Sequence, residues 1–156
     1  MSVIAAGPSL RLRAMTGRLF PACAAVYAAA YAQPPWGERY DRAALCEYFA
    51  RFLTGSGAVG WALCEGSAVV GLLLGVVVPH PAGACLRVED FCVDPAHQRQ
   101  GVGSELLRLA KEQLPALGCD GITLSTVRGY PAQAFYAANG FCELAVSVQM
   151  LWETER

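Results

Sequence analysis

A short glycine-containing loop carries the clearest chemistry in this sequence. It follows an apolar, strand-like run that ends at Val93 and leads into an amphipathic segment. Glycine lets a ligand approach the backbone, and the first N–H groups of a helix favour an anion. We therefore predict a phosphate or pyrophosphate site here; a plain glycine-containing helix start and a nucleotide site of an unrelated enzyme are the alternatives. The loop residues are Gln98, Arg99, Gln100, Gly101, Val102, Gly103 and Ser104.

Two adjacent acidic residues, Glu89 and Asp90, interrupt the apolar run before this loop. Alternation along a strand sends their side chains to opposite faces. Burial would raise the pKa of such a carboxyl toward neutrality and suit it to proton transfer. We predict that Glu89 is a general base, acting directly or through water. The alternatives are Asp90 as the base, a water chain alone, or a Glu89 that binds the substrate amine or forms a salt bridge with Arg87 or Arg128.

The composition argues against several classes of function. The 156 residues carry 12 basic and 13 acidic side chains without a basic block, so no nucleic-acid partner is expected. The longest apolar run, residues 68–78, is shorter than the ~20 residues of a membrane-spanning helix, so no membrane partner is expected. No clean signal-peptide core precedes it, which favours a cytoplasmic protein. The seven cysteines form no Cys-x-x-Cys pair, so we expect no metal.

Hydrophobic periodicity and turn residues predict the elements that position these groups. Their order predicts a single α/β (α+β) domain over residues 1–156, with a mixed, mostly antiparallel central sheet of six to seven strands and flanking helices. A crossover within residues 85–127 makes one pair of strands parallel. The predicted strands are 10–14, 58–64, 67–78, 85–93, 121–127 and 141–152, and the predicted helices are 19–32, 42–53, 102–117 and 131–139.

Two blocks of the sequence resemble the signatures of one protein family. Residues 89–103 end in Gln-Arg-Gln-Gly-Val-Gly, which resembles the (Gln/Arg)-x-x-Gly-x-(Gly/Ala) acetyl-CoA motif of the GCN5-related N-acetyltransferases, the GNAT superfamily. Residues 134–141 resemble the Phe-Tyr-x-x-x-Gly-Phe segment of that family. One helix and one strand separate the two blocks, as the family requires, and the predicted element order matches over nearly the whole chain.

The resemblance implies the acyl-CoA N-acyltransferase fold, with acetyl-CoA (coenzyme A) as the acyl donor. In the family, the main chain of the loop at 98–104 holds the pyrophosphate. The strand before it carries a bulge, splays from its parallel neighbour, and offers the backbone of Phe91, Cys92 and Val93 to the pantetheine arm and the thioester. Tyr136 lies beside the cofactor sulfur and acts as general acid; core packing is the alternative for this residue.

The resemblance also locates the acceptor pocket, at the N-terminal helices and the last strand. Core positions are favoured for Tyr27 and Tyr48, and no acidic cluster indicates a polycationic acceptor. Gly129 stands where many relatives have an asparagine that contacts the cofactor arm. The residues expected around the acceptor are Tyr27, Tyr31, Trp36, Tyr40, Tyr48, Gln149 and Trp152.

Together these features predict an acetyl-CoA-dependent N-acetyltransferase. A primary amine of a small molecule or a peptide would attack the thioester directly, without a covalent acyl-enzyme. The alternative is a catalytically inactive acyl-CoA-binding sensor of the same fold. A homodimer is left open.

Overall fold

The computed structural model describes residues 9–154. The chain divides into two compact units, Met1–Ser125 and Thr126–Arg156, and each is described by itself. The single domain expected over residues 1–156 therefore stays a prediction.

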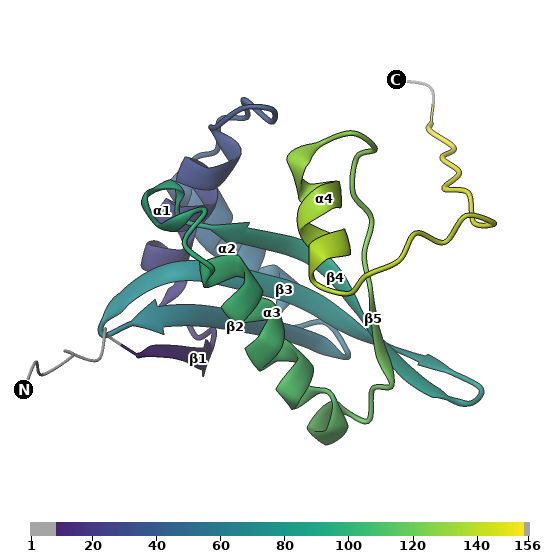
Figure 1. Ribbon diagram of the computed structural model, residues 1–156. Coiled ribbons are helices and arrows are strands. Elements are labelled where there is room, and N and C mark those ends of the chain that lie inside the picture. The colour runs from purple at the N-terminus through teal and green to yellow at the C-terminus, as the bar shows by residue number, and fades with distance from the viewer. Residues whose placement is uncertain (1–8, 155–156) are drawn as a thin grey trace, which may run out of the picture. The chain divides into compact units, whose positions relative to one another are not determined.

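The first unit is built on a mixed sheet in the order β1-β2-β3-β4-β5 (Figure 1). The first three pairs of neighbours are antiparallel, and β4 pairs with β5 in parallel. The predicted fold class is thus confirmed, although the described chain has five strands where six to seven were expected. The strands are β1 (Leu10–Ala14), β2 (Ala58–Glu65), β3 (Ala68–His80), β4 (Gly83–Val93) and β5 (Gly121–Thr123).

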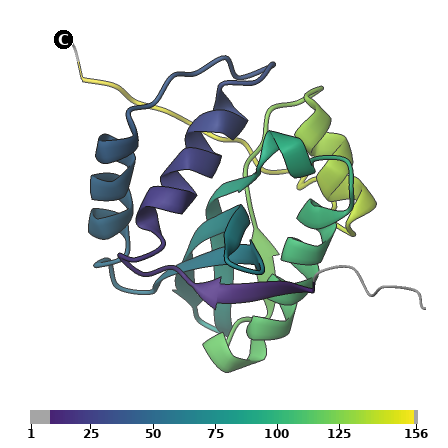
Figure 2. The same ribbon diagram turned by 90° about the vertical axis from the view of Figure 1, so that its left-hand side faces the viewer.

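Helices cover both faces of this sheet. Figure 2 shows α1 and α2 on one face and α3 on the other. Side chains of β3 alternate between the two cores, so that Leu72 and Leu74 pack with α1 and α2, whereas Leu73 packs with α3. The helices of this unit are α1 (Phe20–Tyr31), α2 (Arg42–Phe52) and α3 (Val102–Gln113), with 3-10 turns η1 (Pro95–His97) and η2 (Pro115–Leu117).

Capping and proline set the helix boundaries. Asp41 starts α2, as predicted, because its side chain accepts a hydrogen bond of 2.9 Å from the Ala44 N–H. The third helix ends at Gln113 rather than at the predicted residue 117. Pro115 has no N–H with which to continue the helical hydrogen bonds, and a 3-10 turn begins there instead.

The second unit holds one regular element within its described part, α4 (Pro131–Ala138). The strand predicted over 141–152 is wrong, because residues 141–154 form none. An alternating pattern needs a neighbouring ladder of hydrogen bonds to become a strand, and here Val146 and Trp152 lie 97% and 81% exposed. The predicted strand 121–127 is likewise shortened to β5, whose ladder with β4 ends at Thr123.

Candidate functional site

A bulge in β4 sets the geometry of the candidate site. Leu74 of β3 pairs with Asp90, and the next residue, Gly75, pairs with Val88, so Glu89 is the extra residue. Val88 packs in the core with α3, whereas Asp90 bonds to side chains of α1 and α2. Residues two apart on a regular strand share a face. Because of the bulge, Val88 and Asp90 instead lie on opposite faces of the sheet. The expected bulge is therefore present, and it falls at Glu89.

Beyond the bulge, β4 continues without a described strand on its β5 side. The parallel ladder joins Cys85–Arg87 to Gly121–Thr123 and ends there, whereas β4 runs on beside β3 as far as Val93. The parallel ladder of β4 with β5 therefore does not reach Phe91, Cys92 and Val93. Where a strand continues beyond its partner, main-chain N–H and C=O groups can pair with an extended ligand. The short ladder agrees with the splayed parallel pair that the resemblance implies.

The loop after β4 leads to a helix start that no side chain caps. Gly101 is the N-cap of α3, in the left-handed conformation at φ 79°, and a Cβ placed there would meet no described atom within 4 Å. The first bond into the helix runs from the Glu105 N–H to Gly101 O (3.0 Å). The N–H groups of Val102, Gly103 and Ser104 therefore lack an acceptor in the helix. With the helix dipole, they suit an anion.

Two glutamine side chains brace this loop from within. Gln98 Nε2 donates to Val93 O and Gln100 Nε2 donates to Ala96 O, both at 3.1 Å. Arg99, between them, has a φ of 58°, which is uncommon for a residue with a Cβ. The structure thus brings the predicted loop residues together, but the two glutamine amides act on the protein backbone. The main-chain N–H groups are what the loop offers outward.

Glu89 forms an ion pair with Arg87, with 2.5 Å between Oε1 and Nε. Its side chain is 37% exposed, so solvent reaches it. The salt bridge weighed from the sequence is therefore present with Arg87, whereas Arg128 pairs with Glu143 instead. The bulge at Glu89 interrupts the regular alternation on which the predicted placement of Glu89 and Asp90 on opposite faces was based. A role for Glu89 as general base stays a prediction.

Two tyrosine hydroxyls hold Asp90. Tyr27 of α1 donates to Oδ1 (2.9 Å) and Tyr48 of α2 donates to Oδ2 (2.5 Å). Burial, reinforced by the Asp90 charge and hydrogen bond, raises the pKa of both phenols, so each keeps its proton and remains a donor. No cationic side chain among residues 9–154 forms an ion pair with Asp90. Sequence reasoning missed this arrangement, because three separate elements contribute to it.

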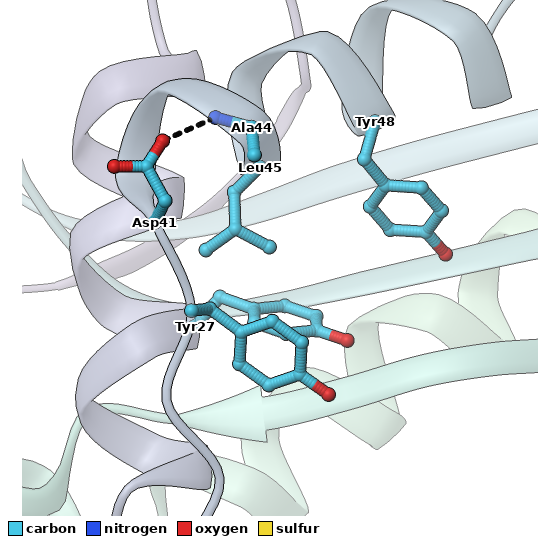
Figure 3. Close-up of a pocket in the computed structure, with 6 residues that line it drawn as sticks. Tyr27, Asp41, Ala44, Leu45 and Tyr48 are labelled. Atoms are coloured by element: carbon cyan, nitrogen blue, oxygen red, sulfur yellow. Dashed lines mark hydrogen bonds between the residues drawn. The ribbon is translucent and has the colours of Figure 1, made fainter.

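A pocket of about 220 Å³ opens beside these tyrosines. In Figure 3 the hydroxyl oxygens of Tyr27 and Tyr48 lie on the same side of it. Tyr27 is 7% exposed and belongs to the core, as predicted. The core position predicted for Tyr48 is wrong: the side chain is 36% exposed because its ring lines the pocket while its hydroxyl reaches Asp90. The lining residues are Tyr27, Tyr40, Asp41, Ala44, Leu45 and Tyr48.

Further rings extend the aromatic wall beside the pocket. The centroid of the Tyr27 ring lies 5.3 Å from that of Tyr40 and 4.5 Å from that of Tyr31, and Tyr31 lies 5.9 Å from Trp36. The Tyr40 hydroxyl donates to Glu38, and this hydrogen bond raises the pKa of Tyr40 to about 12. The structure therefore gathers the aromatic residues that the sequence placed around the acceptor in the N-terminal helices.

Tyr136 lies on α4, in the second unit. Its ring centroid is 5.2 Å from that of Phe135 and 5.5 Å from that of Phe141, so the aromatic residues of the second motif pack on one another. The place of Tyr136 beside the cofactor sulfur stays a prediction. The same holds for the acceptor contacts expected from Gln149 and Trp152.

The structure also bears on the thiol of Cys92, on metal binding and on membrane insertion. Burial raises the pKa of Cys92 well above its ordinary value, so this side chain stays a neutral thiol and what it offers a ligand is its backbone. No group of three or more His, Cys, Asp or Glu that could hold a metal is found in residues 9–154. None of the helices described is long and apolar enough to cross a membrane.

Comparison with known families decides the relationship. Residues 23–141 match the model of the Acetyltransferase (GNAT) family. This chain belongs to the GNAT family. The matched region runs from α1 to Phe141 and so includes the bulged strand, the uncapped helix start and the Phe-Tyr block. The resemblance found in the sequence is confirmed, and membership makes this GNAT protein an acetyltransferase enzyme.

Several solved structures share the fold of this GNAT protein. An integron cassette protein from the mobile metagenome of V. cholerae has a TM-score of 0.80 at 16% identity, over 95% of this chain and 94% of that chain. A transcriptional regulator from Bacillus halodurans C-125 has a TM-score of 0.75 at 22% identity, over 92% and 100%. An aminoglycoside acetyltransferase from an uncultured soil metagenomic sample, in complex with sisomicin, has a TM-score of 0.74 at 15% identity, over 94% and 97%. No curated protein matches the chain.

Proposed function

We propose that this GNAT protein is an acetyl-CoA-dependent N-acetyltransferase that acts on a primary amine of a small molecule or a peptide. The observation that carries the proposal is the order of three features along one segment: the bulge at Glu89, the part of β4 beyond the end of its ladder with β5, and the uncapped start of α3. A strand edge binds an extended amide-containing chain, and a helix start binds a phosphate. The two sites follow one another along the chain, which suits a ligand that has both parts.

The residues present fit coenzyme A at these two places. The N–H groups of Val102, Gly103 and Ser104 would hold the pyrophosphate, with open space at Gly101 for its approach. The backbone of Phe91–Val93 would bind the pantetheine arm along the strand edge. Arg99 would add a positive charge near the phosphates. Acetyl-CoA supplies an activated thioester carbonyl when it is bound.

The proton transfers are assigned to two side chains. Glu89 accepts a proton from the acceptor ammonium, directly or through water, and so frees the nitrogen lone pair for attack. Backbone N–H groups of Phe91–Val93 stabilise the negative charge that develops on the carbonyl oxygen. Tyr136 Oη gives a proton to the sulfur as the C–S bond breaks, and the second proton, which the nitrogen loses as the C–N bond of the amide forms, returns to the Tyr136 oxygen through solvent. Alignment of amine and carbonyl in one cleft supplies much of the remaining rate.

Two measurements test this function. Calorimetric titration with acetyl-CoA reports donor binding, and release of free thiol across a panel of amines reports transfer. We expect binding, and turnover with at least one amine. Binding without turnover on any amine would favour the acyl-CoA sensor, and absence of acetyl-CoA binding by the folded protein would overturn the proposal.

The remaining expectations concern organisation and location. We propose that the two units act together as one transferase domain, since Glu89 lies in the first unit and Tyr136 in the second. A cytoplasmic location and a homodimer are further predictions, which fractionation of cells and light scattering of the purified protein would test.

A further inference from the structure

We infer that the pocket between α1 and α2 binds a small monocationic amine with an apolar or aromatic body, and that Asp90 receives its ammonium group. The inference rests on the proposed function and narrows its acceptor class. It assigns to Asp90 a binding role that differs from the proton transfer proposed for Glu89.

No cation balances the charge of Asp90. Its carboxylate is partly buried and does not itself line the pocket, but its two hydrogen-bond donors, Tyr27 and Tyr48, are neutral and do line it. A carboxylate offers about four acceptor positions, so two hydroxyls leave room for another donor. No cation among residues 9–154 pairs with it. Because a partly buried charge is costly without an opposite charge, an ammonium ligand would complete the site.

The wall of the pocket is aromatic and apolar. Tyr27, Tyr40 and Tyr48 supply aromatic rings, and Leu45 supplies an apolar side chain. A ring face attracts a cation that lies within about 6 Å, and the same rings pack against an apolar body. The wall therefore suits both ends of an alkylamine or arylalkylamine.

The size of the pocket limits its ligand. A volume of about 220 Å³ lies below the ~300–1,000 Å³ typical of pockets for drug-sized ligands. Asp41 also lines the pocket, where one of its oxygens caps α2 through the Ala44 N–H. A small amine therefore suits this volume, and Asp90 supplies the carboxylate for its single ammonium group.

The experiment measures amine binding apart from transfer. The wild-type protein is titrated calorimetrically with 2-phenylethylamine, 3-methylbutylamine, the neutral 2-phenylethanol, spermidine and a tripeptide with a free amino terminus. Each titration is run alone and with saturating coenzyme A, which carries no acetyl group to transfer. We expect the two monoamines to bind, the alcohol to bind about tenfold or more weakly, and spermidine to gain nothing from its extra charges.

Variants locate the binding site. Asp90→Asn should weaken binding of 2-phenylethylamine by about tenfold or more and leave acetyl-CoA binding unchanged. Glu47→Gln is the matched control, because it also removes one carboxylate. Glu47 lies at an exposed position of α2, the helix that carries Tyr48, outside the pocket lining. Circular dichroism and thermal melting establish that each variant is folded. Tyr48→Phe provides a second test if Asp90→Asn does not fold.

The outcomes separate this inference from the proposed function. Equal binding of amine and alcohol, an unchanged amine affinity in both folded pocket variants, or preference for the tripeptide would overturn the assignment while acetyl-CoA binding and transfer stand. If the wild-type protein did not bind acetyl-CoA, the proposed function would be overturned. The amine titrations would then still test the assignment of the pocket.

Discussion

The two sides of β4 carry different kinds of chemical group, on which the proposed donor and acceptor sites depend. Toward α3 and the loop that precedes it, the groups on offer are main-chain N–H and C=O, and the side chains of Gln98 and Gln100 only brace them. Toward α1 and α2, the polar groups belong to side chains, since Tyr27 and Tyr48 donate hydrogen bonds to Asp90. A main-chain surface can serve one common donor, whereas a side-chain surface can be changed residue by residue to suit an acceptor. Variants should therefore affect the two sides separately.

The largest effect is expected from Gly101→Glu, on the main-chain side. The new carboxylate would project into the open space at the start of α3 and repel a phosphate, so acetyl-CoA affinity should fall by about 100-fold or more in calorimetric titration. Gly118→Glu is the control, because Gly118 also has a positive φ, 66°, and open space but lies at the far end of the helical segment. Equal losses in both variants would mean that backbone strain, and not the anion site, is responsible.

Tyr136→Phe should come next, with kcat reduced about 100-fold and acetyl-CoA affinity nearly unchanged. Removal of the hydroxyl takes away the proton donor but leaves the ring that packs on Phe135 and Phe141. Steady-state kinetics with the best amine, together with a titration of acetyl-CoA, separates the two quantities. A parallel loss in both would make Tyr136 a binding residue.

Tyr48→Phe tests the side-chain surface and should raise the KM for the amine about tenfold with a small change in kcat. It removes one of the two hydrogen bonds to Asp90 while the ring still lines the pocket. The acetyl-CoA affinity serves as the internal control, since no loop residue is altered. If that affinity fell as well, the two sides of β4 would not be independent.

The smallest effect is expected from Asp41→Ala, which should lower the free energy of unfolding by about 1 kcal/mol through loss of the α2 cap. Chemical denaturation measures this loss. Because α2 carries Tyr48, amine affinity should weaken slightly and acetyl-CoA affinity should not. A stability identical to that of the wild type would show that the Ala44 N–H finds another acceptor, such as water.

The strand, loop and helix start proposed to bind the donor could be predicted from the sequence for a physical reason. They lie within one continuous segment, 89–104, and follow one another in order. The side-chain surface joins residues as far apart as Tyr27 and Asp90, and no local pattern records that contact. The tyrosines were expected near the acceptor, but their common carboxylate was not found.

The errors in the fold arose where a local pattern lacked its tertiary partner. Residues 141–152 alternate like a strand yet have no described ladder, and the strand predicted over 121–127 stops where its pairing with β4 stops. Regular alternation along β4 is broken between Val88 and Asp90, because a bulge inserts Glu89 between them. The early end of α3 is marked in the sequence by Pro115, because proline cannot continue the helical hydrogen bonds.

The bulge has a consequence for how chain length could vary at this site. Because Leu74 and Gly75 already pair with Asp90 and Val88, loss of Glu89 alone would leave a regular strand in which both neighbours keep their present faces. Both cores and the tyrosine-held carboxylate would survive such a one-codon deletion, whereas a deletion nearer Val93 would exchange the two faces. A single residue that packing does not require thus sets the local bend of β4. The number of residues in this segment, more than their types, would therefore decide whether β4 is a regular strand or the bulged strand proposed to bind a ligand.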